Sequence, residues 1–171
     1  MLEEPRNVAP VNIRQYFVIG FETPQPLGKQ PADAKGHMSM IGYFTENPNV
    51  RHSKTIAEHL DSISIRRMNL PGKKLKRMGR FQATVLDDPT GELTAAKDEL
   101  YAALKADGYI CVKPEYYESG GDYKPHVSAD PAERLEAPRE SFELNNLSVT
   151  ESRFTQHYRF LGSEILHTRV F

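Results

Sequence analysis

Two copies of the pattern H-x-S are the residues most able to do chemistry in this sequence. The first copy is His37 and Ser39, and the second is His126 and Ser128. Both copies lie in runs typical of a β-strand, where side chains two positions apart share a face. An imidazole and a hydroxyl therefore point the same way in each copy. If the two strands lie side by side, four polar groups converge on one site.

Such a quartet suits the cleavage of a phosphodiester. The reaction needs a base to activate the attacking oxygen and an acid to protonate the leaving oxygen, and histidine can do either near neutral pH. We expect His37 and His126 to be this catalytic pair, with the assignment of acid and base left open. The hydroxyls of Ser39 and Ser128 can donate to the non-bridging phosphate oxygens and stabilise the charge that develops there.

Three further residues are predicted to bind substrate. Strand alternation predicts that Ile41 and Tyr43 share the face of the first motif. Tyr123 leads into the second motif, and both tyrosines could stack on a base. Lys124 lies two residues before His126, so it could contact phosphate or be an exposed lysine at a strand edge.

A basic segment from Arg66 to Arg80 is predicted to be a connecting loop. It carries seven cations in fifteen residues, whereas the formal net charge of the whole chain is -1. Overall charge therefore does not favour nucleic-acid binding, but a local patch can hold phosphates. Contact with a phosphate backbone and a merely solvated loop both remain open for this segment.

Length and composition predict one folded domain over residues 1–171, with residues 1–14 as an N-terminal extension. Of the 171 residues, 39% are hydrophobic and 26% charged, which is ordinary for globular proteins. The single cysteine, Cys111, excludes an internal disulfide framework and paired-cysteine zinc sites. We expect a cytoplasmic protein with no membrane span, metal or cofactor, because neither a signal peptide nor ligand spacing is visible. The oligomeric state stays open.

The order of predicted elements is mixed, which indicates an α+β fold. Strands are expected over 15–21, 37–44, 81–86, 109–112, 126–129, 142–144, 147–149, 158–161 and 164–170, and a loop over 23–35. One short helix should begin at Asn47 and Pro48 and carry His52 and His59 on its surface. A longer helix should start at Asp88 and end at Gly108. Two βα halves, around 15–63 and 81–130, would pack side by side in front of the closing strands.

At these motifs the sequence resembles the 2H phosphoesterase superfamily, which includes the LigT-like RNA 2′,3′-cyclic phosphodiesterases, also called the 2′-5′ RNA ligase family. The signature of that group is a pair of H-x-T/S motifs. Gly42, five residues after His37, and the run 123–125 before His126 extend the resemblance. It implies two pseudo-symmetric lobes of antiparallel sheet with helices outside and the active cleft between them. It also implies general acid–base roles for the two histidines and phosphate binding by the two serines.

The sequence departs from this pattern in ways that leave the substrate open. Serine stands where threonine is usual, and Ala129 and Asp130 replace the leucine and arginine often found after the second motif. The run around His126 also resembles phage nucleases that degrade cyclic oligonucleotide immune signals. The predicted function is a metal-independent phosphodiesterase acting on a nucleotide or RNA, at a 2′,3′-cyclic phosphate or a 2′-5′ linkage. The alternatives are such a cyclic-oligonucleotide nuclease and a non-catalytic nucleotide- or RNA-binding module.

Overall fold

One ten-stranded antiparallel sheet organises the computed structural model, which describes residues 13–30, 36–130 and 132–171. The strand order is β2-β10-β9-β1-β3-β7-β5-β4-β8, and β6 pairs with β3 beside this path. The strands are β1 (Ile13–Phe21), β2 (Gly28–Gln30), β3 (His37–Thr45), β4 (Met68–Met78), β5 (Phe81–Leu86), β6 (Ile110–Cys111), β7 (His126–Ser128), β8 (Ser141–Leu144), β9 (Asn146–Phe154) and β10 (Phe160–Val170). The helices are α1 (Ile56–Ser62), α2 (Glu92–Ala106) and α3 (Pro114–Tyr117).

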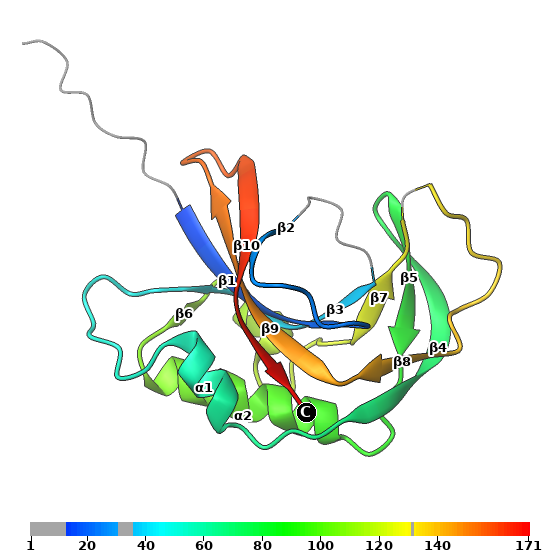
Figure 1. Cartoon of the computed structure of the whole chain (residues 1–171), viewed down its shortest axis with the longest axis horizontal. Helices are drawn as coiled ribbons and strands as arrows, with labels where there is room; N and C mark the ends of the chain where they lie inside the picture. Colours follow the sequence, from blue (N-terminus) through cyan, green and yellow to red (C-terminus); the bar gives the residue numbers. More distant parts are fainter. Residues whose placement is uncertain (1–12, 31–35, 131) are drawn as a thin grey trace, which may run out of the picture.

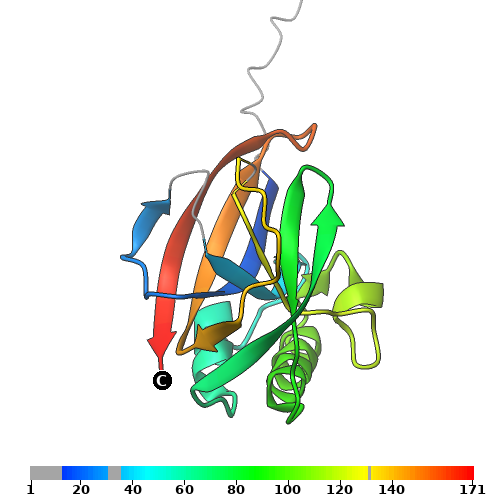
Figure 2. The same ribbon diagram turned by 90° about the vertical axis from the view of Figure 1, so that its right-hand side faces the viewer.

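The helices α1 and α2 cover one face of the sheet (Figure 1). Leu93, Leu100 and Leu104 of α2 belong to the same buried cluster as Met38 of β3 and Val127 of β7. We call the face of the sheet turned away from these helices the open face. The sheet is curved, so that the β9–β10 hairpin and the β4–β5 hairpin rise on its two sides (Figures 1 and 2).

The predicted α+β fold is confirmed, and its two halves meet within a single sheet. β1 and β3 form the first half, and β5 and β7 form the second. β3 and β7 are hydrogen-bonded neighbours at the centre of the strand order. The two motif strands therefore lie side by side.

Local caps explain where the two longer helices begin. Thr55 and Glu58 form a capping box, in which each side chain accepts from the backbone N–H of the other residue. The helix predicted from Asn47 is therefore wrong in its start, since α1 begins only at Ile56. The predicted start of the longer helix at Asp88 is also wrong, since α2 begins at Glu92, but the carboxylate of Asp88 accepts from the backbone N–H groups of Leu93 and Thr94 in its first turn.

The basic segment is not a loop, and that prediction is wrong. β4 pairs through its first four residues with β8 and through the rest with β5, across a two-residue turn in which Gly79 has a φ of 63°. Most of its side chains are exposed, and its second half lies beside β5 alone. Lysine-rich edge strands of this kind avoid unwanted pairing with other chains. Because so many of their residues are charged, the alternation of apolar and polar residues that predicts a strand is not visible in the sequence.

Smaller differences concern the ends of elements. The last two residues of the predicted N-terminal extension, Ile13 and Arg14, belong to β1 and pair with β9. The rest of the predicted extension, residues 1–12, lies outside the described part. A short strand, β2, lies inside the predicted loop 23–35, of which 31–35 are not described. The strand predicted from Tyr158 starts at Phe160, because Tyr158 sits in a turn with a φ of 60°.

Candidate active site

The register between β3 and β7 brings the two H-x-S motifs together. Met38 pairs with Val127 in an antiparallel ladder, and both side chains are buried in the core. The residues on either side of this pair therefore face the opposite way, onto the open face. His37 lies across from Ser128, and Ser39 lies across from His126. We call these four half-buried side chains the histidine–serine quartet.

The quartet has the spacing of a binding site for one small anion. Side chains directly across an antiparallel pair have Cβ atoms about 5 Å apart, and diagonal neighbours are about 7–8 Å apart. The two histidines are diagonal neighbours, and so are the two serines. A phosphate lying over the centre of the quartet could thus have the two imidazoles at opposite ends of one diagonal and the two hydroxyls at opposite ends of the other.

The ring of His126 is held by the backbone just before it. Its Nδ1 lies 3.0 Å from the carbonyl oxygen of Lys124. Because a carbonyl oxygen can only accept, the proton of this hydrogen bond belongs to Nδ1. Nε2 is then the nitrogen available to exchange a proton with a substrate, and the ring orientation is set in advance.

His37 is positioned by packing at the first residue of β3. It pairs across the ladder with Phe21, and the two rings are tilted at 54° with centroids 6.1 Å apart. The chain next to Phe21 is anchored by an ion pair between Glu22 and Arg139 and by a hydrogen bond from Glu22 N to Gly36 O. The first histidine therefore sits against a buried aromatic ring at a fixed strand position.

A bulge in β3 sets which of its side chains reach the open face. Ile19 pairs with Ser39 but Val18 pairs with Ile41, so Met40 is an extra residue. Ile41 therefore joins the buried core instead of the face of Ser39, and a second register shift between Ile41 and Phe44 brings Phe44 back to the core as well. The prediction that Ile41 shares the face of His37 is wrong for this reason. Bulges commonly re-aim side chains next to functional sites.

Tyr123 supports the first motif from the neighbouring segment. Its hydroxyl donates to the carbonyl oxygen of Ser39 at 3.1 Å, and its ring packs against Tyr116 and Tyr117 with the Lys97 ammonium 5.3 Å from the ring centre. Burial raises the pKa of Tyr123 well above its usual value, so the hydroxyl stays protonated and donates. The ring of Tyr123 therefore packs against other aromatic side chains, and its hydroxyl fixes the position of the β3 backbone at Ser39.

Tyr43 packs against the buried core, and Lys124 lies just before the second motif. Tyr43 has a φ of 59°, and its ring contacts Phe17 edge-on, with the ammonium of Lys113 4.2 Å above it. One face of that ring is thus occupied by a cation. The side chain of Lys124 is exposed, while its backbone orients His126. Their predicted substrate contacts stay predictions.

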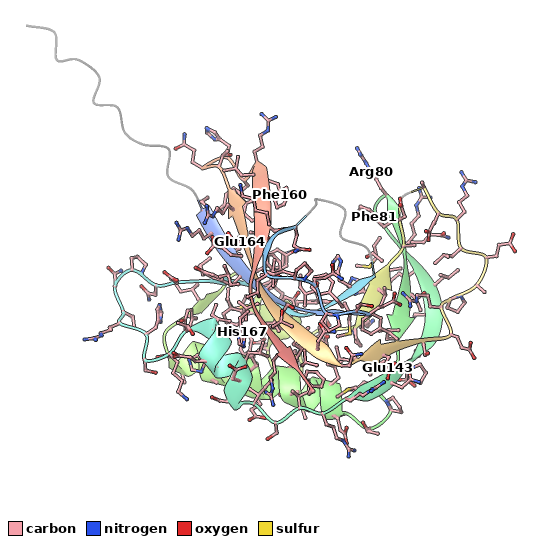
Figure 3. The ribbon with its side chains drawn as sticks, viewed as in Figure 1. Arg80, Phe81, Glu143, Phe160, Glu164 and His167 are labelled. Carbon is pink, nitrogen blue, oxygen red and sulfur yellow. The ribbon has the colours of Figure 1, made fainter. Side chains whose placement is uncertain are left out.

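A pocket of about 200 Å³ adjoins the first motif. Its apolar floor comes from alternate residues of β1 and from Phe160 of β10, and small polar residues of β9 and β10 form its side. The lining consists of Phe17, Ile19, Phe21, Gln30, His37, Ser39, Thr150, Ser152, Phe160 and Ser163. Figure 3 shows Phe160 on the side of the molecule opposite Arg80 and Phe81. The sequence could have indicated Phe17 through the alternation of β1, but the contributions of β9 and β10 depend on long-range pairing.

A second cluster of histidines is structural. The Nε2 of His59, which is buried, lies 2.6 Å from a carboxylate oxygen of Asp107. His52 stacks on Tyr109 with ring centroids 3.9 Å apart. His59 was expected on the surface, and that expectation is wrong because Asp107, at the end of α2, supplies a partner distant in sequence.

The described residues contain neither a metal-binding cluster nor a membrane-spanning helix. No three or more His, Cys, Asp or Glu side chains among them are grouped in a way that could hold a metal ion. None of the helices in the same part of the chain is long and apolar enough to cross a bilayer.

Solved structures with a similar fold match most of the chain. Escherichia coli LigT in complex with 3′-AMP matches with a TM-score of 0.58 and 15% identity, over 94% of this chain and 99% of LigT. A structure described as a phosphoesterase matches with a TM-score of 0.54 and 16% identity, over 90% and 97% of the two chains. The ATP complex of LigT gives a TM-score of 0.55 and 13% identity, over 94% and 99%. No model of a known protein family and no curated protein matches the sequence. These similarities confirm the predicted fold.

Proposed function

We propose that this protein is a metal-independent phosphodiesterase that cleaves a nucleotide or RNA phosphodiester with His37 and His126. The observation that carries the proposal is the β3–β7 register, since it brings two matched imidazole–hydroxyl pairs to one face. A module that only bound a nucleotide would not need two imidazoles diagonal to each other. A paired acid and base need this arrangement, because the attacking and leaving oxygens lie on opposite sides of the phosphorus.

In this mechanism a 2′,3′-cyclic phosphate lies over the quartet. One histidine takes a proton from a water molecule as its oxygen bonds to phosphorus. The bond between phosphorus and the 2′ or 3′ oxygen breaks, and the other histidine donates a proton to that oxygen. His126 exchanges its proton through Nε2, because Nδ1 is held by the carbonyl of Lys124. Ser39 and Ser128 donate to the non-bridging oxygens, whose charge grows in the transition state.

The pocket beside His37 supports a nucleotide as the substrate. Its aromatic floor matches the flat face of a base, and its polar side matches a ribose. LigT, one of the proteins with a similar fold, has been solved with 3′-AMP, NADP⁺ and ATP, which are all nucleotides. A 2′-5′ linkage in RNA presents the same phosphate and sugar groups, so it belongs to the same proposal.

The test is a turnover panel with the products identified. It contains nucleoside 2′,3′-cyclic phosphates, 3′,5′-cyclic nucleotides, cyclic di- and trinucleotides, and short RNAs with 2′-5′ or 3′-5′ linkages. We expect hydrolysis of 2′,3′-cyclic phosphates or 2′-5′ linkages that persists after exhaustive chelation. Tight nucleotide binding without turnover of any member would identify a binding module. Activity that disappears on chelation and returns with one divalent ion would replace the two-histidine mechanism with a metal-dependent one.

A further inference from the structure

The row of side chains across the quartet continues into β5 and β4. Ser128 pairs with Ala83, and Ala83 pairs with Lys76. His126 pairs with Val85, and Val85 pairs with Lys74. Directly paired residues of antiparallel strands point to the same face. Lys74 and Lys76 therefore stand on the open face, in the same two rows as the second motif.

The alternate residues confirm this orientation. Val127 pairs with Thr84 and Thr84 with Leu75, which places this middle row on the face of the core. The Thr84 hydroxyl there accepts from the backbone N–H of Arg139 at 2.9 Å, so residues before β8 cover that face. The two lysines on either side of Leu75 must point the other way.

Both lysines are available to bind an anion. Their side chains are exposed, and none of the ion pairs within the described residues uses either ammonium. Arg66 and Arg67, at the other end of the basic segment, are instead paired with Glu92 and Glu143. Neighbouring strands are about 4.8 Å apart, so the backbone of β4 lies roughly 10 Å from that of β7. A flexible lysine stem can shorten this gap toward the quartet.

The paired residues of β5 that stand between the lysines and the second motif are Ala83 and Val85. Ala83 and Val85 are both buried and carry no charge. Along these two rows of paired residues, the ammonium groups of Lys74 and Lys76 are the first charged groups after the quartet. This arrangement suits a ligand with a second phosphate one nucleotide unit away from the phosphate that reacts.

We propose that Lys74 and Lys76 form a second phosphate subsite, so that the preferred substrate carries a further phosphate beside the scissile phosphodiester. This inference rests on the proposed function for the reacting phosphate, while the subsite itself is a matter of binding. Nucleosides with a 5′-phosphate and oligonucleotides both offer the required group.

The strand supplies a matched control for this proposal. Arg77 follows Lys76 and has the same charge, but it pairs with Gln82, whose side chain hydrogen-bonds the backbone of Leu135 on the other face. Lys76→Gln and Arg77→Gln therefore remove one positive charge each from adjacent residues on opposite faces. The double variant Lys74→Gln/Lys76→Gln removes the whole subsite.

The experiment measures binding and turnover of ligand pairs that differ by one 5′-phosphate. Titration calorimetry compares adenosine 3′-phosphate with adenosine 3′,5′-bisphosphate, and kinetics compare adenosine 2′,3′-cyclic phosphate with and without a 5′-phosphate. For the unmodified protein we expect the second phosphate to improve affinity and kcat/KM about tenfold or more, as a charged hydrogen bond typically does. Lys76→Gln should lose most of this preference and the double variant nearly all of it, while Arg77→Gln keeps it. Rates with the simple cyclic phosphate should not change.

Two outcomes would overturn the subsite. One is equal binding of the two ligands by the unmodified protein, and the other is an equal loss in Lys76→Gln and Arg77→Gln, which would show a general charge effect. If no cyclic phosphate is hydrolysed but the binding preference is present and depends on Lys76, the subsite stands and the proposed function fails. If simple cyclic phosphates are hydrolysed without any preference, the function stands and the subsite fails.

Discussion

The two sides of the histidine–serine quartet differ in chemistry although the quartet itself is symmetric. Toward β1, β9 and β10 lies a pocket with an aromatic floor and small polar residues. Toward β5 and β4 lie two buried apolar side chains and then two exposed lysines. The antiparallel pairing of β3 with β7 makes the two motifs equivalent in geometry. The residues on the two sides of the motifs contact different parts of a substrate, so they need not be alike. With the proposed function and subsite, we expect a substrate to bind in one orientation, with its base toward β1 and its further phosphate toward β4.

The largest effect on this comparison is expected at the aromatic side. Phe160 lines the pocket and is 46% exposed, so Phe160→Ala should leave the fold intact. Stacking of a base on an aromatic ring is worth about 1–3 kcal/mol, which predicts a loss of about 5- to 150-fold in kcat/KM for a nucleoside cyclic phosphate. Leu161→Ala, at an exposed neighbour outside the pocket lining, is the control. Equal losses of kcat/KM in both variants would show that the base does not bind in this pocket.

A smaller effect should follow from loosening the first motif. Tyr123→Phe removes the hydrogen bond to the Ser39 carbonyl and keeps the ring. A typical hydrogen bond contributes about 0.5–1.5 kcal/mol, so kcat should fall several-fold with little change in KM, because the support acts on Ser39 in the transition state. Tyr109→Phe, which removes a bond from a tyrosine hydroxyl to the Lys54 carbonyl away from the quartet, should leave kcat unchanged. A change in KM alone for Tyr123→Phe would indicate direct contact with substrate.

The smallest effect is a difference in salt dependence between the two sides. Binding of a short RNA should weaken with rising salt, with a log–log slope of about 0.7 for each phosphate contact. The double lysine variant should show a slope smaller by the amount that corresponds to about one or two phosphate contacts. Phe160→Ala should keep the slope of the unmodified protein. Parallel salt dependences in the unmodified protein and the lysine variant would place the RNA phosphates elsewhere.

The sequence predicted the features that depend on local alternation. The H-x-S pairs on strands and the strand Phe81–Leu86 follow from runs rich in β-branched and aromatic residues. The glycine signal at Gly108 also holds, since α2 ends at Ala106 and Gly108, just beyond it, has a φ of 88°. The same reasoning identified the quartet as one site once the two strands were assumed to be neighbours.

Features that depend on partners far along the chain were missed. β4 was predicted as a loop, because a charged edge strand shows its pairing only beside β5. The bulge at Met40 cannot be read from the sequence around it, since the register with β1 creates the extra residue. His59 is buried because Asp107 ends a helix elsewhere in the sequence. Alternation within one strand says nothing about any of these contacts.

The turnover of His37→Ala and His126→Ala tests whether the two histidines act as an acid–base pair. Each should lose about 10²–10⁴-fold in kcat with the fold and nucleotide binding preserved, because general acid–base catalysis typically contributes that much. The double variant should lose little more than the worse single variant, since the two residues act as a unit. Near-full activity in either single variant, toward the substrate that the unmodified protein hydrolyses best, would contradict the paired-histidine mechanism.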